Sequence, residues 1–231
     1  MEEGNMKTGI FPRLFVKILM AAIVLVLMVP SAFALTINFA TGQDVSGNIQ
    51  TIGNSLDANW LSSNAANPEN PPYSYVVAPN NQDWYSGWFA NGPNSSWIAA
   101  NPLDGHGNGN FTLTYTFNLT GYNLATAAFS GLQFSMDDQG YVQINGITVS
   151  TEPYIGGMSY YWTTFTIPAN DLVQGFNTLT MTDENTDDWL EAGRLEGTLQ
   201  INPAGVPEPT TMLLLGLGLI GVAGVRRKFK S

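Results

Sequence analysis

The sequence of 231 residues contains no cysteine. This absence excludes disulfide bonds, zinc sites with cysteine ligands, iron–sulfur clusters and thiol catalysis. His106 is the only histidine, so no histidine pair is available as a metal-binding set. Charged residues make up only 11% of the chain, far below the roughly 25% of an average soluble domain. The 44% of hydrophobic residues is nevertheless enough for one sizeable folded domain.

Positive charge is almost absent from the middle of the chain. Between Leu35 and Val206 there is no lysine, and Arg194 is the only arginine. The same stretch contains 15 aspartate and glutamate residues, which gives it a formal charge of −14. Such a body cannot neutralise phosphate groups, so nucleic acid is excluded as a partner. Its composition favours cations or neutral glycans as ligands.

Residues 1–34 have the pattern of a secretory signal peptide. A basic start is followed by an apolar run of 12 residues over 18–29, which is short for a membrane span. Ala32 and Ala34 then provide the small residues that signal peptidase requires. We expect cleavage after Ala34 and a mature chain that begins at Leu35. An uncleaved anchor is the alternative.

The C-terminal segment 206–231 combines a short proline-rich motif, an apolar run and a basic end. The motif and the basic end consist of Val206, Pro207, Glu208, Pro209, Arg226 and Arg227. The apolar run predicts a transmembrane helix over about residues 211–225. This helix is short for a hydrocarbon core about 30 Å thick. Because positive charge stays on the cytoplasmic side, we expect the body to lie outside the inner membrane.

These three features, in this order, resemble the PEP-CTERM sorting domain of Gram-negative bacteria. The resemblance implies recognition by an exosortase, a membrane transpeptidase, with processing near Pro207, Glu208 and Pro209. It also implies that the membrane anchor is transient. The final location is then the cell surface or an exopolysaccharide (biofilm) matrix. A plain tail anchor is the alternative.

The body, residues 35–205, has the period-two alternation of antiparallel β-strands. Apolar residues alternate with Thr and Asn over 111–119, and Asn145-Gly146 is typical of a type I′ hairpin turn. A two-residue turn pairs Ile144 with Ile147 and Val142 with Val149. Further strands are expected at 36–39, 73–77, 129–136, 163–167, 177–181 and 195–201. The Asn-, Ser- and Pro-rich stretch 54–72 is expected to be a surface loop. We therefore predict an all-β antiparallel sandwich of the jelly-roll type.

The core of this body, residues 94–201, resembles the galactose-binding-like jelly roll of carbohydrate-binding modules. Three ordered motifs carry the resemblance: Asp-Gln-Gly-Tyr-Val-Gln-Ile-Asn-Gly at 138–146, Phe-Thr-Ile-Pro at 165–168 and Gly-Phe-Asn-Thr-Leu at 175–179. The sequence departs from the family pattern at Ala192-Gly193-Arg194, where an apolar residue commonly precedes the arginine. The resemblance implies a non-catalytic domain that binds a carbohydrate.

Aromatic residues are candidates for sugar contact. Trp84 and Trp88 lie in the segment Trp-Tyr-Ser-Gly-Trp-Phe, next to Asn and Gly. An aromatic face in a loop can stack on a sugar ring, while amides and carboxylates bond its hydroxyls. We add Arg194 as a third candidate. The alternative is that these rings fill the core.

Acidic residues between Asp183 and Glu191 are candidates for a calcium site. Five acids occur within these nine residues, and oxygen ligands suit calcium. The start resembles an EF-hand loop, but Asp188 replaces the required glycine and Arg194 the required glutamate, so it is not an EF-hand. The candidate ligands of a different calcium loop are Asp183, Asn185, Asp187 and Asp188. A solvated acidic loop, partly offset by Arg194, is the alternative.

No catalytic residues are identified. Adjacent residues on a strand point to opposite faces, so Asp137 and Asp138 are not expected to flank a glycosidic bond. The leading interpretation is therefore an exported, non-catalytic glycan-binding or structural module. A polysaccharide-processing enzyme, either a glycoside hydrolase or a lyase, and a matrix protein without a ligand remain as alternatives.

Overall fold

The computed structural model describes residues 33–63, 73–80, 84–100, 110–154, 161–184, 186, 190–204 and 218. The segment Ala34–Ala204 forms one compact unit. Ala32 of the predicted signal peptide lies outside the described residues, and so do the predicted sorting residues Val206, Pro207, Glu208, Pro209, Arg226 and Arg227. In these described ranges, no helix is long and apolar enough to cross a membrane.

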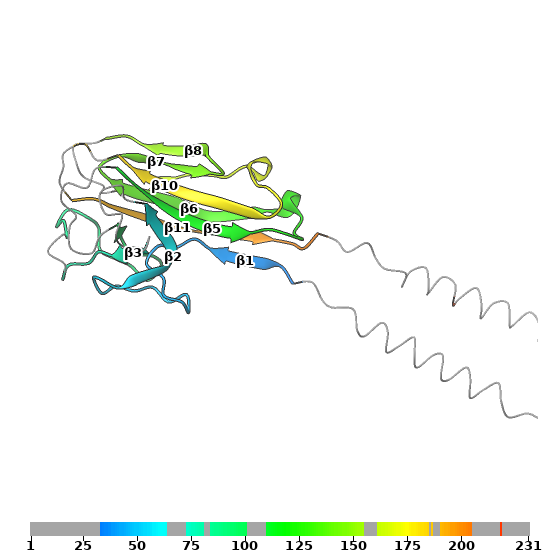
Figure 1. The fold of residues 1–231 in the computed structure, drawn as a ribbon, viewed down its shortest axis with the longest axis horizontal. Coiled ribbons are helices and arrows are strands. Elements are labelled where there is room, and N and C mark those ends of the chain that lie inside the picture. The colour runs from blue at the N-terminus through cyan, green and yellow to red at the C-terminus, as the bar shows by residue number, and fades with distance from the viewer. Residues whose placement is uncertain are drawn as a thin grey trace, which may run out of the picture. The chain divides into compact units, whose positions relative to one another are not determined.

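The compact unit is all-β, as predicted (Figure 1). Its strands are β1 Leu35–Asn38, β2 Leu56–Ser63, β3 Tyr73–Val76, β4 Ile98–Ala99, β5 Phe111–Asn118, β6 Ala128–Asp137, β7 Gly140–Ile144, β8 Ile147–Glu152, β9 Thr163–Thr164, β10 Phe176–Asp183 and β11 Ala192–Ile201. Two short 3₁₀ helices, η1 Leu124–Thr126 and η2 Ala169–Asp171, occur between strands. The strands follow the order β8-β7-β10-β5-β2-β3-β4-β11-β6-β9, and β1 adds to β11. Each of these pairings is antiparallel.

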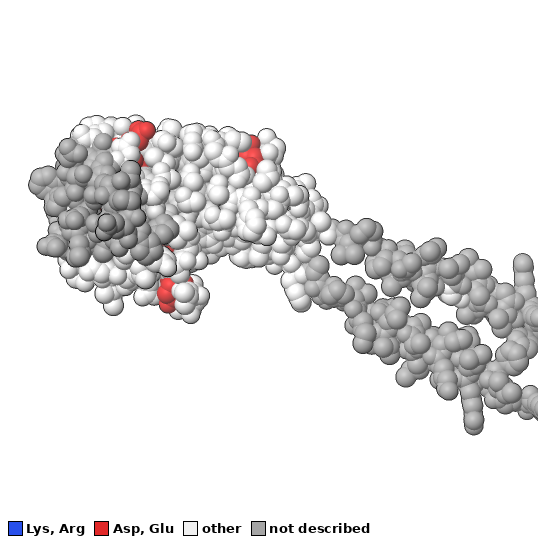
Figure 2. Space-filling model, viewed as in Figure 1, with Lys and Arg blue, Asp and Glu red and all other residues white. Residues whose placement is uncertain are grey.

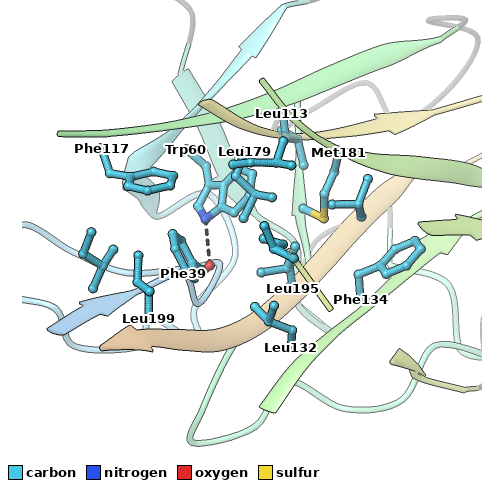
Figure 3. Packing of buried hydrophobic residues seen from close by; sticks show 14 of the residues in the cluster. Phe39, Trp60, Leu113, Phe117, Leu132, Phe134, Leu179, Met181, Leu195 and Leu199 are labelled. Carbon is cyan, nitrogen blue, oxygen red and sulfur yellow. Dashed lines mark hydrogen bonds between the residues drawn. The ribbon is translucent and has the colours of Figure 1, made fainter. Parts of the chain in front are cut away.

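The sheet folds into two layers that enclose the core. In β5, Phe111, Leu113 and Phe117 are buried, while the intervening threonines are more accessible, as the alternation predicted. Figure 3 shows side chains of β2, β5 and β10 facing those of β6 and β11 across the interior. The central contact is Trp60, whose indole N–H donates to the Phe39 carbonyl at 3.1 Å; both side chains are fully buried. The N-terminal strands therefore share the core of the C-terminal ones.

Strand β2 corrects the prediction of a surface loop over 54–72. Residues Leu56–Ser63 form a strand that pairs with β5, with Trp60 opposite Tyr115. Asp57, Trp60 and Ser62 face inward. The polar composition of this stretch obscured the alternation, because two of its three inward residues are polar. Residues 64–72 lie outside the described part of the chain.

The predicted hairpin between β7 and β8 is confirmed at its turn. Asn145 and Gly146 have φ angles of 51° and 80°, as a type I′ turn requires, and Ile144 pairs with Ile147. Beyond the turn, the prediction fails by one residue, because Val142 pairs with Ser150 instead of Val149. A β-bulge between Val142 and Gln143 causes this register shift. The expected strand 163–167 is also shorter, since only Thr163–Thr164 pairs with β6.

Candidate functional site

Acidic side chains from separate strands gather at one end of the sandwich, where β6, β8 and β10 end (Figure 1). Asp183 lies opposite Gly140 of β7, and Glu152 pairs with the same glycine from the other side. Asp137 lies opposite Ala192, which follows Glu191. Each side chain of this set is at most 5% exposed. We call the set the carboxylate cluster: Asp137, Asp138, Glu152, Asp183 and Glu191.

Asp183 is the central acid of the carboxylate cluster. Its side chain is 1% exposed, and neither carboxylate oxygen has a hydrogen-bond partner among the described residues. Burial raises the pKa of Asp183 well above its usual value, and the negative charges of Glu191, Asp137, Asp138 and Glu152 raise this pKa further. A charged carboxylate in this position is costly unless a cation or a proton compensates it.

Hydrogen bonds hold three other carboxylates of the cluster, those of Asp137, Asp138 and Glu152. The Trp88 indole N–H donates to Asp137 Oδ2 at 2.7 Å. Asp138 Oδ2 accepts from the backbone N–H and the hydroxyl of Thr186, at 2.9 and 2.6 Å. The backbone N–H of Met136 donates to Glu152 at 3.2 Å. The peptide bond between Asp137 and Asp138 is cis. These bonds tie the loop after β10 to the end of β6.

The predicted calcium ligands are described only in part. Asp183 is in the cluster, whereas Asn185, Asp187 and Asp188 lie outside the described residues. Within the ranges that the structure describes, no group of three Asp, Glu, His or Cys side chains could by itself hold a metal ion. The clustered carboxylates therefore repel each other without converging on one point. A bound cation would also need ligands from the loop 185–189.

The two predicted tryptophans differ in their accessibility. Trp88 is only 4% exposed, and its ring stacks on Trp97 with a centroid distance of 5.1 Å. Sugar contact by Trp88 would require the ring to leave this packing. Trp84 is half-buried and meets Trp88 edge to face at 5.6 Å, so part of its ring remains accessible.

Arg194 is also a core residue, 4% exposed. Its guanidinium lies 4.9 Å from the Phe89 ring centroid and 5.1 Å from that of Trp162. It donates to the Ser95 hydroxyl and to the Ala90 carbonyl, both at 2.8 Å. Burial lowers the pKa of Arg194 to about 10, so it stays charged at neutral pH. Its interactions therefore hold the segment 89–95 on β11 and do not reach the carboxylate cluster.

A polar groove with a volume of about 840 Å³ lies elsewhere on the body. It is lined by Asn38, Gly47, Asn48, Ile49, Thr51, Asn91, Gly92, Pro93, Asn94, Ser130, Gly131, Glu196, Gly197 and Thr198. Among these lining residues there is one charged side chain, Glu196, and no aromatic ring. The sequence offered no signal for this groove, because its walls come from segments far apart in the chain.

The C-terminal segment matches the model of a known family. Residues 205–228 match the PEP-CTERM protein-sorting motif, which confirms the resemblance predicted from the sequence. The chain therefore carries a PEP-CTERM sorting signal, which implies an exported protein that an exosortase processes at the membrane. No curated protein matches the chain.

Three solved structures are similar to the chain at low identity. A family 35 carbohydrate-binding module from Clostridium thermocellum is 12% identical, with 75% of this chain and 100% of that chain covered and a TM-score of 0.30. A family 35 module from an environmental isolate is 16% identical, with 64% and 98% covered and a TM-score of 0.29. The PA14 domain of the MpAFP antifreeze protein is 15% identical, with 78% and 84% covered and a TM-score of 0.29.

Proposed function

We propose that this protein is an exported, exosortase-processed, non-catalytic glycan-binding module of the cell surface or exopolysaccharide matrix. In this proposal a calcium ion stabilises the end of the sandwich that carries the carboxylate cluster. The sorting motif at 205–228 supports export and processing. The acidic body, with Arg194 engaged in the core, favours a neutral or cationic ligand over an anionic one.

The hydrogen bond from Trp88 to Asp137 is the observation that carries the proposal. It joins the aromatic segment to the carboxylate cluster, which contains Asp183, one of the predicted calcium ligands. Trp84, next to Trp88, keeps part of its ring accessible. The accessible part of this aromatic face can stack on a sugar ring, while the buried acids beside it hold the aromatic segment in place.

The buried carboxyl group of Asp183, which has no hydrogen-bond partner among the described residues, supports calcium as the cofactor. No lysine occurs in the body, and Arg194 lies against other residues, so the described protein supplies no counter-charge. On the face shown in Figure 2, the described residues include acidic side chains and no lysine or arginine. Calcium takes six to eight oxygen ligands in flexible geometry, whereas magnesium demands a tight octahedron and retains its waters. Asn185, Asp187 and Asp188, which follow Asp183 in the sequence, carry further oxygen atoms of the kind that calcium accepts.

The placement of the carboxylates supports binding over catalysis. Glycoside hydrolysis generally requires two carboxyl groups on either side of the scissile bond. Among the described residues, the acids of the carboxylate cluster are buried, and the polar groove presents Glu196 alone. A polysaccharide-processing enzyme is the competing function. Release of new reducing ends from matrix polysaccharide would identify it.

Glycan retention tests the proposal directly. The full chain, purified in a detergent without a sugar headgroup, is applied to a glycan array in millimolar calcium and again in EDTA. We expect retention in calcium, loss in EDTA, and weaker retention for Trp84→Ala. Phe176→Ala is the matched control, because Phe176 is an exposed aromatic at the other end of β10. Retention that neither EDTA nor Trp84→Ala reduces would contradict the proposal.

A further inference from the structure

We infer that the polar groove is a second glycan-binding site, specific for neutral oligosaccharides and separate from the carboxylate cluster. It goes beyond the proposed function, because that function places sugar contact beside Trp84. The groove volume of about 840 Å³ is within the range of small-molecule sites, about 300–1,000 Å³.

Two glycines on paired strands line the floor of the groove. Gly197 of β11 has a φ of 141° and Gly131 of β6 a φ of 63°, a region that favours glycine. A Cβ at position 197 would lie 2.6 Å from Leu132 Cδ2 and 3.1 Å from the Gly131 carbonyl. The register shifts between Glu196 and Thr198, where Gly131 and Leu132 of β6 lie opposite the single residue Gly197, so β6 carries a bulge here. The floor is therefore a specific local structure instead of a gap between regular strands.

The walls of the groove are held in place by the protein's own hydrogen bonds. On one side, Asp44 Oδ1 accepts from the backbone N–H groups of Ser46 and Asn48, at 2.8 and 2.9 Å. On the other side, Asn91 accepts from the Trp97 N–H at 2.8 Å and donates to the Val77 carbonyl at 2.7 Å. A groove whose walls are fixed in the absence of a ligand loses little conformational entropy when it binds one.

Several polar side chains of the groove have unused hydrogen-bonding capacity. The side chains of Thr51, Asn94, Ser130 and Thr198 accept or donate no hydrogen bond within the described residues, and three of them are exposed. Amide and hydroxyl groups of this kind match the donors and acceptors of sugar hydroxyls. Because no aromatic ring lines the groove, recognition depends on these hydrogen bonds.

The charge of the groove selects the class of glycan. Glu196 is the only charged lining residue; it accepts from the Ser95 hydroxyl at 3.2 Å and from the Gln133 side-chain amide. A fixed carboxylate accepts hydrogen bonds from sugar hydroxyls. Arg194 interacts electrostatically with Glu196 but is buried behind Gly92, so no lysine or arginine lines the groove to bind uronic acids or phosphates. A neutral oligosaccharide is therefore the ligand that fits.

The groove is far from the carboxylate cluster along the same strand. Ser130 lies seven residues before Asp137 in β6, which corresponds to roughly 20 Å at about 3.3 Å per residue. Two sites at this separation let one module hold two segments of a polymer. Such bivalence strengthens retention in a matrix without new contacts at either site.

Calorimetric titration of the full chain with neutral and uronic-acid oligosaccharides tests the groove, again in a detergent without a sugar headgroup. We expect the neutral oligomers to bind. Asn94→Ala and Thr198→Ala should each raise Kd about fivefold to tenfold, the usual effect of losing one hydrogen bond. Asn170→Ala is the matched control, because Asn170 is exposed in η2 and does not line the groove.

The outcomes separate the groove from the proposed function. The groove site is supported if Asn94→Ala and Thr198→Ala weaken binding of the neutral oligosaccharides and Asn170→Ala does not. This conclusion holds even if Trp84→Ala and EDTA have no effect. Unchanged Kd values in both groove variants overturn it, and so does a preference for uronic acids. If Trp84→Ala and EDTA abolish retention while the groove variants bind normally, the proposed function is supported and the second site is excluded.

Discussion

The indole N–H of Trp88 donates a 2.7 Å hydrogen bond to the carboxylate of Asp137, across 49 residues of sequence. Both side chains are buried, and the ring of Trp88 also stacks on Trp97. This bond connects the aromatic cluster to the acids at the ends of β6 and β10. Its disruption is expected to affect both groups together.

Trp88→Phe is expected to destabilise the protein by about 2 kcal/mol, because it removes a hydrogen bond to a carboxylate and leaves a small gap. Urea unfolding followed by fluorescence measures the change. Trp84→Phe is the control, because the Trp84 ring contacts Trp88 but its indole makes no hydrogen bond to a described residue. Equal losses in the two variants would show that ring size, and not the bond to Asp137, determines the effect.

Calcium is expected to raise the Tm by several degrees. A ligand that binds only the folded protein stabilises it by about 2.7 kcal/mol at 100 times its Kd. Melting curves of the full chain are compared in millimolar calcium, in EDTA and in sodium chloride of equal ionic strength. Asp183→Asn should lose the calcium effect, whereas Asp171→Asn in η2 should keep it. If sodium chloride matches calcium, general screening of the acidic body is the cause.

Stability without calcium is expected to fall as the pH rises. The pKa of Asp183 is raised in the folded state, so folding favours its protonated form. This contribution is fully present below the usual carboxyl pKa and is lost as the pH rises through the raised pKa. The measurement is the difference in Tm between the wild type and Asp183→Asn in EDTA from pH 4 upward. A difference that does not change with pH would show that Asp183 ionises normally.

Gly140→Ala is expected to destabilise the protein by about 3 kcal/mol. A Cβ at this position would collide with the Thr182 carbonyl and with the Met136 sulfur, and the carbonyl is backbone that cannot easily move. Gly121→Ala is the control, because its added Cβ meets nothing within 4 Å and the cost is only that of its positive φ of 82°. Chemical unfolding should show the larger loss for Gly140→Ala. Equal losses would indicate that β7 shifts to admit the methyl group.

Replacing Pro207, Glu208 and Pro209 together with alanine is expected to leave the protein in the inner membrane. These residues lie within the matched sorting motif at 205–228. Immunoblots of inner-membrane, surface and medium fractions measure the distribution. Alanine replacements at Asn202 and Pro203, before the motif, are the control. Normal release of the triple variant would mean that these residues are not required for sorting.

Local patterns in the sequence predicted much of the fold. The alternation over 111–119 predicted β5, and Asn145-Gly146 predicted the β7–β8 turn, because both depend on neighbours a few residues apart. Strand β2 was not predicted, since its inward positions include the polar Asp57 and Ser62. Asp57 is acceptable inside because its carboxylate accepts backbone N–H groups from Gly42, Asn59 and Trp60, the first from a distant segment.

The sequence by itself determined the sorting signal, the absence of thiol chemistry, the acidic body and the β-rich fold, because each depends on composition or on short patterns. Only the tertiary structure placed Trp88 and Arg194 in the interior and brought Asp137, Glu152 and Asp183 to one end of the sandwich. It also formed the groove between Asn94 and Thr198. The physical reason is that antiparallel pairing joins strands far apart in the chain. Which side chains share an end or a groove is then set by strand order and register, and a β-bulge of one residue is enough to change it.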